Sequence, residues 1–290
     1  MPLLHLTDPT IPRNEGCRPI NIVAPPGTIV NCKYPAALVG GTPKSAPASP
    51  TSSLGRCPKP PTGCLPLGGT SCCFLFGGMH PETGQLYSHF HFEGIGWGGR
   101  PRKDGNSQLI VINGNCRNTP VEIFENRYPL SIETYRLLED SGGPGKNRGG
   151  LGIERIFTIQ CPEVTVSALF NRMLVEPFGL HGGKPGHSSG IYVRRAGQKK
   201  WQTFKKVFGT VSPSKFSGII LRQGDQVKII APGGGGWGDP LAREPERVLQ
   251  DVVEGFVTPA AALQEYGLEI VEQRRGEFVV AAEVGRGKTV

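Results

Sequence analysis

The stretch Gln226-Val-Lys-Ile-Ile-Ala-Pro-Gly-Gly-Gly-Gly-Trp-Gly-Asp-Pro, residues 226–240, decides the fold that we expect for this chain. It starts as a run of apolar and β-branched residues of strand length, and Pro232 and four consecutive glycines then end that strand. Glycine and proline are also abundant elsewhere, with 42 Gly and 27 Pro in 290 residues. Such a chain must turn often and cannot hold many long helices.

Short strand patterns extend outward from this stretch along most of the chain. They cover residues 71–76, 86–93, 108–113, 131–138, 153–159, 164–170, 191–195, 217–221 and 226–231. Residues 121–127 predict a short helix, which Pro129 ends. Because many short strands with turn signals between them are typical of antiparallel sheets, we predict a mainly β (α+β) fold with glycine-rich loops.

Helical spacing is clear only near the C-terminus. Residues 244–254 show apolar side chains at helical intervals, with Pro245 near the start. A second helix is expected with Thr258 as its N-cap, Pro259 at its first position and Gly267 closing it. The fold class therefore includes two short C-terminal helices.

Composition divides the chain into four parts. Residues 1–40 carry short strand patterns around a turn at residues 24–27, whereas residues 41–66 are rich in Pro and Ser with almost no apolar anchors. The second part predicts an insert or loop, because it buries too little apolar surface to offset its ordering entropy. Residues 67–240 form the expected glycine-rich β domain, and residues 241–290 a helical tail.

The charge pattern limits the kinds of binding partner that we expect. The formal net charge is +8, but Lys and Arg are scattered, which disfavours nucleic-acid binding and fits an ordinary basic surface or an acidic partner. The N-terminus lacks the pattern of a secretory signal, and no apolar run is long enough to cross a bilayer. We therefore expect a cytoplasmic protein without membrane contact, whose eight cysteines are reduced thiols.

Two features invite a functional interpretation beside an ordinary structural one. His89, His91 and Glu93 have the same parity in a strand, so they share one face and could ligate a metal, or could form a polar, half-buried strand face. The run Gly233–Gly236 could cradle a phosphate, but no Gly-Lys-Ser/Thr follows it and the next helix starts too late. Tight backbone packing is the favoured interpretation of the glycines. Lys146 and Arg148 in the loop 140–152 could likewise hold an anion, although a surface loop is favoured.

No sequence signature assigns a reaction. The chain contains no Cys-x-x-Cys and no His-Glu-x-x-His, and no cysteine shows the neighbouring base that a nucleophile needs.

An ordered series of short motifs carries a resemblance over nearly the whole chain. It comprises Asn14-Glu-Gly-Cys, Ala24-Pro-Pro-Gly-Thr-Ile-Val-Asn, Pro35-Ala-Ala, Phe76-Gly-Gly, Gly96-Trp-Gly-Gly-Arg-Pro, Arg117-Asn-Thr-Pro-Val-Glu, Arg127-Tyr-Pro, Asp140-Ser-Gly-Gly-Pro-Gly, Arg148-Gly-Gly-Leu-Gly, Gly179-Leu-His-Gly-Gly-Lys-Pro-Gly and Ala231-Pro-Gly-Gly-Gly-Gly-Trp-Gly-Asp-Pro. In order and spacing this series resembles the C-terminal half of the hydantoinase B/oxoprolinase family.

The resemblance implies a B-type subunit of an ATP-dependent enzyme that hydrolyses cyclic amides such as hydantoins and oxoproline. It further implies that ATP binds a hydantoinase A-type partner subunit. A divalent metal is also implied, held by His and Asp motifs of an N-terminal half that this sequence does not include. Acetone carboxylase subunits are relatives and give one alternative. A non-catalytic remnant or assembly module is another, because residues 41–66 replace a segment that is helical in the family.

Four residues in the family's characteristic segments are our candidates for the cleft, with roles in orienting substrate and stabilising charge: Glu93, Arg100, Asn118 and Thr119. Each has a structural alternative. Arg100 could instead pair with Glu93, and Asn118 and Thr119 could instead cap the helix that begins at Pro120.

Overall fold

The computed structural model describes residues 23, 25–28, 31, 33, 72–110 and 117–285. Contacts divide the chain into two units, residues 1–64 with 112–114 and residues 65–111 with 115–290. The described residues of the first unit form a turn, in which Gly27 has a φ of 85° and donates its N–H to the Asn31 carbonyl at 2.7 Å. This confirms the turn expected there, and the features below all belong to the second unit.

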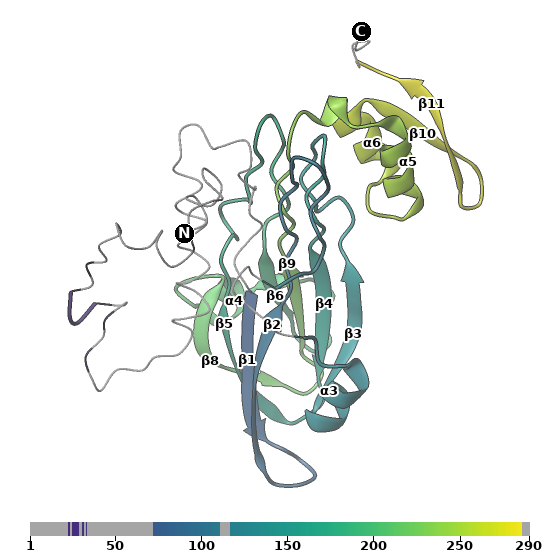
Figure 1. Ribbon diagram of the computed structural model, residues 1–290. Helices are drawn as coiled ribbons and strands as arrows, with labels where there is room; N and C mark the ends of the chain where they lie inside the picture. The colour runs from purple at the N-terminus through teal and green to yellow at the C-terminus, as the bar shows by residue number, and fades with distance from the viewer. Residues whose placement is uncertain are drawn as a thin grey trace. The chain divides into compact units, whose positions relative to one another are not determined.

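Two antiparallel sheets form most of the second unit (Figure 1). The first has the order β2-β1-β5-β8, with β1 Cys72–Met79, β2 Leu86–Glu93, β5 Glu163–Leu169 and β8 Lys215–Arg222. The second has the order β3-β4-β9-β6-β7, with β3 Leu130–Leu137, β4 Ile153–Ile159, β6 Gly190–Arg194, β7 Gln202–Thr203 and β9 Gln226–Ala231. The mainly β, antiparallel fold class is confirmed.

One hydrophobic core joins the two sheets. Phe74 of β1 stacks on Phe157 of β4 with ring centroids 5.7 Å apart, and Val166 of β5 and Ile229 of β9 are fully buried in the same cluster. Burying one such side chain stabilises the fold by about 1.5–3 kcal/mol. The short helix α3 (Val121–Arg127), at the residues expected, adds Phe124 to this core, and α4 (Phe204–Phe208) adds its own first residue.

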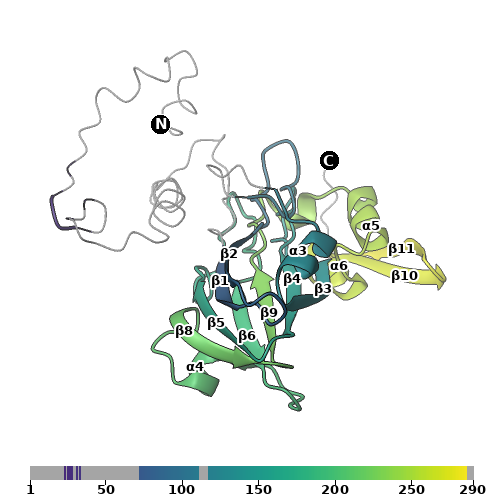
Figure 2. The ribbon, with the colours of Figure 1, turned by 90° about the horizontal axis from the view of Figure 1, so that it is seen from below.

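Glycine-rich segments lie side by side between the strands and the C-terminal helices, as Figures 1 and 2 show. They span residues 94–107, 140–152, 177–189 and 232–238 and are joined by backbone hydrogen bonds such as Gly234 N–H to Gly150 O at 2.9 Å. A Cβ on Gly233 would lie 1.7 Å from the Ser141 carbonyl oxygen. Only glycine permits this approach, so the predicted tight backbone packing is confirmed.

The C-terminal residues form a small module with a core of its own. It contains η1 (Pro240–Ala242), α5 (Pro245–Val253), α6 (Pro259–Tyr266), β10 (Leu268–Arg274) and β11 (Glu277–Glu283). Both predicted helices are present, with Thr258 accepting from the Ala261 N–H and Gly267 closing α6 at a φ of 65°. The hairpin β10–β11 was not predicted, because most side chains of β10 are exposed and give no apolar alternation.

One strand prediction is wrong where the structure describes it. In the segment 108–113, Gln108 has a φ of 51° and Leu109 forms only an isolated bridge to Ile95. Leu109 is 37% exposed rather than buried. A positive φ interrupts strand geometry, and residues 111–113 lie outside the described residues.

Candidate functional site

A polar cavity of about 390 Å³ lies along β2, the edge strand of the first sheet. Its lining includes His89 and His91 of β2, Gln108, and the three residues before Pro120, which are Arg117, Asn118 and Thr119. This volume falls in the range of small-molecule sites, roughly 300–1,000 Å³. Residues from three separate segments therefore converge on a space large enough for a small cyclic molecule.

Strand alternation sets the orientation of the histidines. His89, His91 and Glu93 fall on one face of β2, and that face packs toward the core, as the ring of His91 lies 5.5 Å from that of Phe157 at 86°. His91 is only 5% exposed and Glu93 only 1% exposed. Two polar side chains at this depth require partners, because burying an unpaired polar group is costly.

The partner of Glu93 is Arg155, which β4 of the opposite sheet supplies. Nε of Arg155 lies 2.6 Å from Oε1 in ion-pair contact, and Nη2 donates to Oε2 at 3.2 Å. Arg155 is itself fully buried, with its guanidinium 3.7 Å from the centroid of the Tyr135 ring. Burial alone would raise the pKa of Glu93, but His91 and Arg155 outweigh it and hold that pKa below its ordinary value. Glu93 is therefore a carboxylate.

His91 is tied to the same carboxylate. Its Nε2 lies 2.8 Å from Oε1 of Glu93. An ionised carboxylate only accepts hydrogen bonds, so Nε2 must carry the proton in this pair. Among the described residues, nothing donates to or accepts from Nδ1 of His91. The arrangement resembles the carboxylate–imidazole pairs in which an acid fixes the tautomer of a base.

His89 has a different environment. Its ring lies among aromatic side chains, 4.8 Å from the ring of Tyr128 and 5.7 Å from that of Phe124. Desolvation, followed by the charges of His91 and Arg127, lowers the pKa of His89 to about 4. His89 is therefore neutral at pH 7, and its Nε2 is buried without a hydrogen-bond partner in the described part of the chain.

Comparison with known proteins identifies the family. The family model described as hydantoinase B/oxoprolinase matches residues 1–240. The chain belongs to the hydantoinase B/oxoprolinase family. It is 31% identical over 269 residues to the B-type subunit of a putative D-/L-hydantoinase from Pseudomonas sp. (strain NS671), a match that covers 92% of this chain and 43% of that protein. The chain thus spans less than half the length of that relative.

Two solved structures share the fold of this family member. An ATP-dependent caprolactamase from Pseudomonas jessenii aligns with a TM-score of 0.61 and 21% identity, over 87% of this chain and 44% of that one. A nucleotide-free acetone carboxylase aligns with a TM-score of 0.63 and 23% identity, over 75% of this chain and 32% of that one. At such identities these likenesses support the fold alone.

The structure separates the four candidate residues of this hydantoinase B-type chain. Glu93 lies under the cavity, and Asn118 and Thr119 line it. Asn118 donates to the Tyr135 hydroxyl and accepts from Nη2 of Arg155 at 3.5 Å, which joins it to the Glu93 cluster. No side chain caps α3, so the capping alternative is wrong.

Arg100 lies elsewhere. Its Nη2 donates to the Asp104 carbonyl at 2.8 Å and to Oδ1 of Asn106 at 2.7 Å, within its own glycine-rich segment. The expected alternative, a pair between Arg100 and Glu93, is also wrong because Arg155 occupies the carboxylate. Arg155 was missed by the sequence reasoning, since no motif links it to Glu93 across 62 residues.

The metal alternative for β2 does not fit the described residues. Glu93 has both carboxylate oxygens in contact with Arg155, and the His91 nitrogen that faces it carries a proton. Within residues 72–110 and 117–285, no three His, Cys, Asp or Glu side chains converge as a metal site would require.

The glycine segments do not fit a phosphate cradle. Backbone amides of the run 233–236 are used by neighbouring segments, Gly233 donating to His187 O at 3.1 Å and Gly236 to Lys184 O at 2.9 Å. Arg148, a proposed anion ligand, is buried and donates two hydrogen bonds to the carboxylate of Asp251 in α5, at 3.1 and 3.2 Å. Residues 140–152 form a loop, but most of them are buried, so the expectation of a surface loop is wrong, and the arginine is structural.

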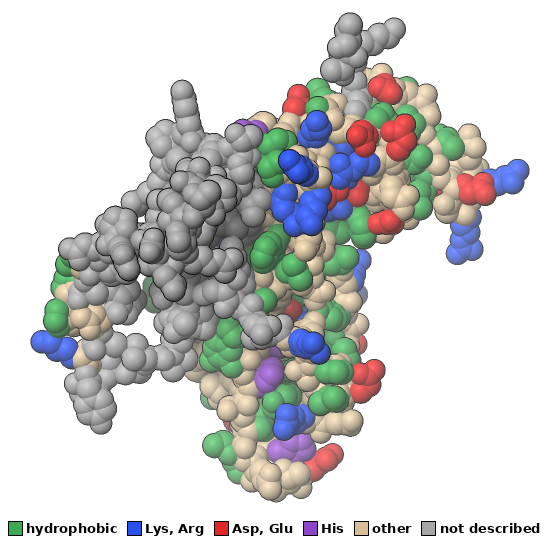
Figure 3. Space-filling view, viewed as in Figure 1, with side chains coloured by type: hydrophobic (Ala, Val, Ile, Leu, Met, Phe, Trp, Pro, Cys, Tyr) green, Lys and Arg blue, Asp and Glu red, His purple; other side chains and the backbone are tan. Residues whose placement is uncertain are grey.

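A buried charge network, missed by the sequence reasoning, holds the C-terminal module on the glycine segments. Arg243 donates to both oxygens of Asp104, at 2.7 and 2.9 Å, and to Asp251 at 2.6 Å, while Arg247 donates to Asp104 at 2.7 Å. Burial would raise the pKa of Asp104, but Arg243 in particular holds it below its ordinary value. Figure 3 shows Lys and Arg gathered where the glycine segments meet this module.

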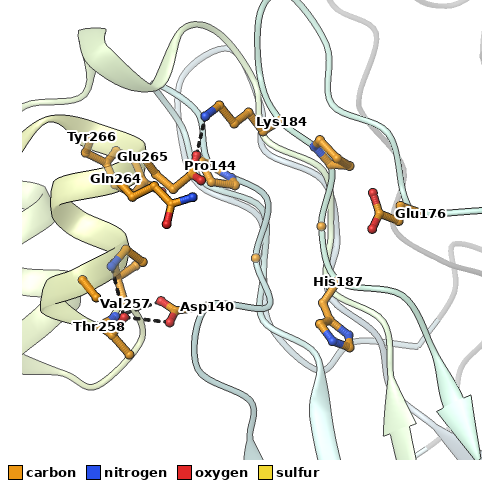
Figure 4. A pocket seen from close by; sticks show the side chains of 15 residues that line it. Asp140, Pro144, Glu176, Lys184, His187, Val257, Thr258, Gln264, Glu265 and Tyr266 are labelled. Atoms are coloured by element: carbon orange, nitrogen blue, oxygen red, sulfur yellow. Dashed lines mark hydrogen bonds and ion pairs between the residues drawn. The ribbon is translucent and has the colours of Figure 1, made fainter. Parts of the chain in front are cut away.

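A second cavity, of about 470 Å³, lies between the glycine segments and α6 (Figure 4). Two contacts cross beside it: Thr258 donates through its N–H and hydroxyl to Asp140, at 2.8 Å each, and Lys184 pairs with Glu265 at 2.5 Å. Glu176 and His187 line the opposite wall and are exposed. Its polar side chains mostly hold the module in place, so it is the weaker candidate for a site.

Two further expectations concern the rest of the chain. Cys72, Cys73 and Cys161 are buried, reduced cysteines, as expected, and the other five cysteines lie outside the described residues. No helix among the described residues is long and apolar enough to cross a membrane.

Proposed function

We propose that this chain is a B-type subunit, or the C-terminal half of one, of an ATP-dependent cyclic amide hydrolase of the hydantoinase/5-oxoprolinase type. Family membership supports this, as do the names of its relatives, which include the B-type subunit of a hydantoinase and the beta subunit of a caprolactamase. The observation that carries the proposal is the buried His91–Glu93–Arg155 cluster beside a polar cavity of about 390 Å³. Such a cluster holds an imidazole ready for proton transfer at a small-molecule site.

The proposal assigns ATP to an A-type partner and the amide to the cavity of this chain. The solved relatives are described as ATP-dependent, and the described glycine segments offer no phosphate site. A divalent metal, if the enzyme uses one, takes its ligands from residues other than those described. We also propose that the protein is cytoplasmic, in keeping with its family membership.

The test is ring opening by the purified chain, alone and co-expressed with an A-type subunit. Hydantoin, 5-oxoproline and caprolactam serve as probes, and both ADP and the ring-opened product are measured. Hydrolysis that requires ATP and the partner supports the proposal. If the complex is soluble but turns over none of these amides, the proposed hydrolase function is refuted and the non-catalytic module is favoured.

A carboxylase is the second candidate, because a solved acetone carboxylase shares this fold. It predicts that ATP consumption by the same complex depends on bicarbonate and a ketone rather than on an amide.

A further inference from the structure

We propose that His91 is the general base of this chain, acting through Nδ1 on a water molecule in the cavity along β2, with Glu93 as its positioning residue. This inference rests on the proposed function, and it names the groups that perform the hydrolytic step. Glu93 was expected to contact substrate; here it acts through His91 instead. The ligand class is a small amide, with water as the second reactant.

The hydrogen bond between His91 and Glu93 fixes which nitrogen is free. Oε1 of Glu93 receives Nε2–H of His91 at 2.8 Å, and Arg155 contacts both carboxylate oxygens. The neutral imidazole then has its lone pair on Nδ1. No described residue bonds to that nitrogen, and His91 lines the cavity. A base needs this combination of a held tautomer and an open acceptor.

Packing holds the ring in place. The His91 ring meets Phe157 of β4 at 86° and 5.5 Å and Phe124 of α3 at 72° and 6.2 Å. Glu93 is fully buried, so its carboxylate does not turn away from His91 toward solvent. A base preorganised in this way loses little entropy when it acts.

The charged and titratable groups around His91 come from four elements. His89 and Glu93 on β2 face His91 directly, whereas Arg155 on β4 and Tyr135 on β3 act on Glu93, and Arg127 on α3 acts on His89. Arg117 lines the same cavity. Glu93 and Arg155 compensate each other, and His89 is neutral at pH 7. The imidazole therefore works beside a neutralised pair rather than an isolated charge.

In the hydrolytic step that His91 would serve, the proton and electron counts close with water and the amide, while the ATP that the proposed function requires is consumed at the A-type partner. Nδ1 takes a proton from water as the water oxygen forms a bond to the amide carbon, and the carbonyl π electrons move to the carbonyl oxygen. When the adduct collapses, the C–N bond breaks and the imidazolium returns the proton to the leaving nitrogen. Because the amide is part of a ring, the product is one ring-opened molecule that carries a carboxylic acid at one end and the protonated leaving nitrogen at the other.

The decisive variant is His91→Gln in the complex with the A-type subunit, assayed with hydantoin and caprolactam. The Gln amide can replace Nε2–H as a donor to Glu93 but offers no base at the position of Nδ1. We expect kcat to fall about 10²–10⁴-fold with KM changed less than about threefold, because a base acts on the chemical step. Glu93→Gln should lower kcat less and shift the acidic limb of the pH–rate profile. His80→Gln, in the turn after β1, is the matched control and should retain full activity.

A second measurement does not depend on turnover. ¹⁵N NMR of histidine-labelled chain should show His91 as the Nε2–H tautomer, and Glu93→Gln should remove that preference. If the wild type turns over an amide and His91→Gln keeps more than a tenth of its kcat, His91 is not the general base, and the proposed function still stands. A proton found on Nδ1 of neutral His91 would lead to the same conclusion. Absence of wild-type turnover with every amide refutes the proposed function itself, and the base with it.

Discussion

Replacing Gly234 by alanine tests whether the glycine segments are a close-packed backbone assembly. An ideal Cβ at this position lies 2.0 Å from the Trp97 carbonyl oxygen and 2.2 Å from its carbon, distances that no van der Waals contact permits. Both atoms belong to backbone, so no side chain can rotate away. The segments themselves must move apart.

The cost follows from that movement. Overpacking costs about 1–3 kcal/mol, and separation of the segments weakens two hydrogen bonds, from Gly234 N–H to Gly150 O at 2.9 Å and from Gly143 N–H to Gly234 O at 2.7 Å. At roughly 0.5–1.5 kcal/mol for each bond, the total is about 2–6 kcal/mol. For a protein of this size that lowers the melting temperature by about 4–12 °C.

The assay compares thermal and urea unfolding of wild type, Gly234→Ala and Gly78→Ala. Gly78 in β1 is the matched control, because a Cβ there would meet its nearest atoms at 3.4 Å, an ordinary contact. We expect the control to unfold within about 2 °C of wild type. A Gly234→Ala protein as stable as the control would refute the close-packed interpretation.

Three other changes give distinct outcomes. Since the pKa of His89 is about 4 against an ordinary 6.5, its contribution to stability is complete above pH 6.5 and is lost as the pH falls to 4. Partial exposure of His89 to solvent screens this contribution to roughly 1–2 kcal/mol, so the stability lost between pH 7.5 and pH 4.5 in urea unfolding should be smaller in His89→Gln than in wild type. Asp251→Ala leaves Arg148 and Arg243 buried without this carboxylate and should cost about 3–5 kcal/mol by denaturant unfolding, and an effect below about 1 kcal/mol would contradict the network. Tyr266→Phe removes a buried hydroxyl that lacks a partner among the described residues, so calorimetry should find it neutral or stabilising by up to about 1 kcal/mol.

Local patterns predicted the elements because their causes are local. The apolar, β-branched run of β9 and the Thr258–Pro259–Gly267 signals of α6 depend on neighbours in sequence, and both elements are present where expected. The hairpin β10–β11 could not be predicted in this way. Most side chains of β10 are exposed, and what stabilises the hairpin is its contact with α5 and α6, which is tertiary.

In the candidate site too, only the features that depend on local sequence could be predicted. Parity in β2 correctly placed His89, His91 and Glu93 on one face. The partner that determines their chemistry is Arg155, 62 residues from Glu93, and the sequence offers no signal for it. Arg148 and Asp251 pair across 103 residues, and Asp104 and Arg243 across 139, so these charged side chains could not be recognised as structural.

The motifs that carry the family resemblance therefore report packing more than chemistry. Their glycines stand where a Cβ would strike a neighbouring backbone, as at Gly233, Gly234 and Gly149, and their Arg148 is buried against Asp251. A family with this architecture must keep such residues whatever reaction it performs. A catalytic side chain is expected where a titratable group is buried, has a hydrogen-bond partner on one side and is open to a cavity on the other. Among the described residues that line the cavity along β2, His91 is the one that meets all three conditions.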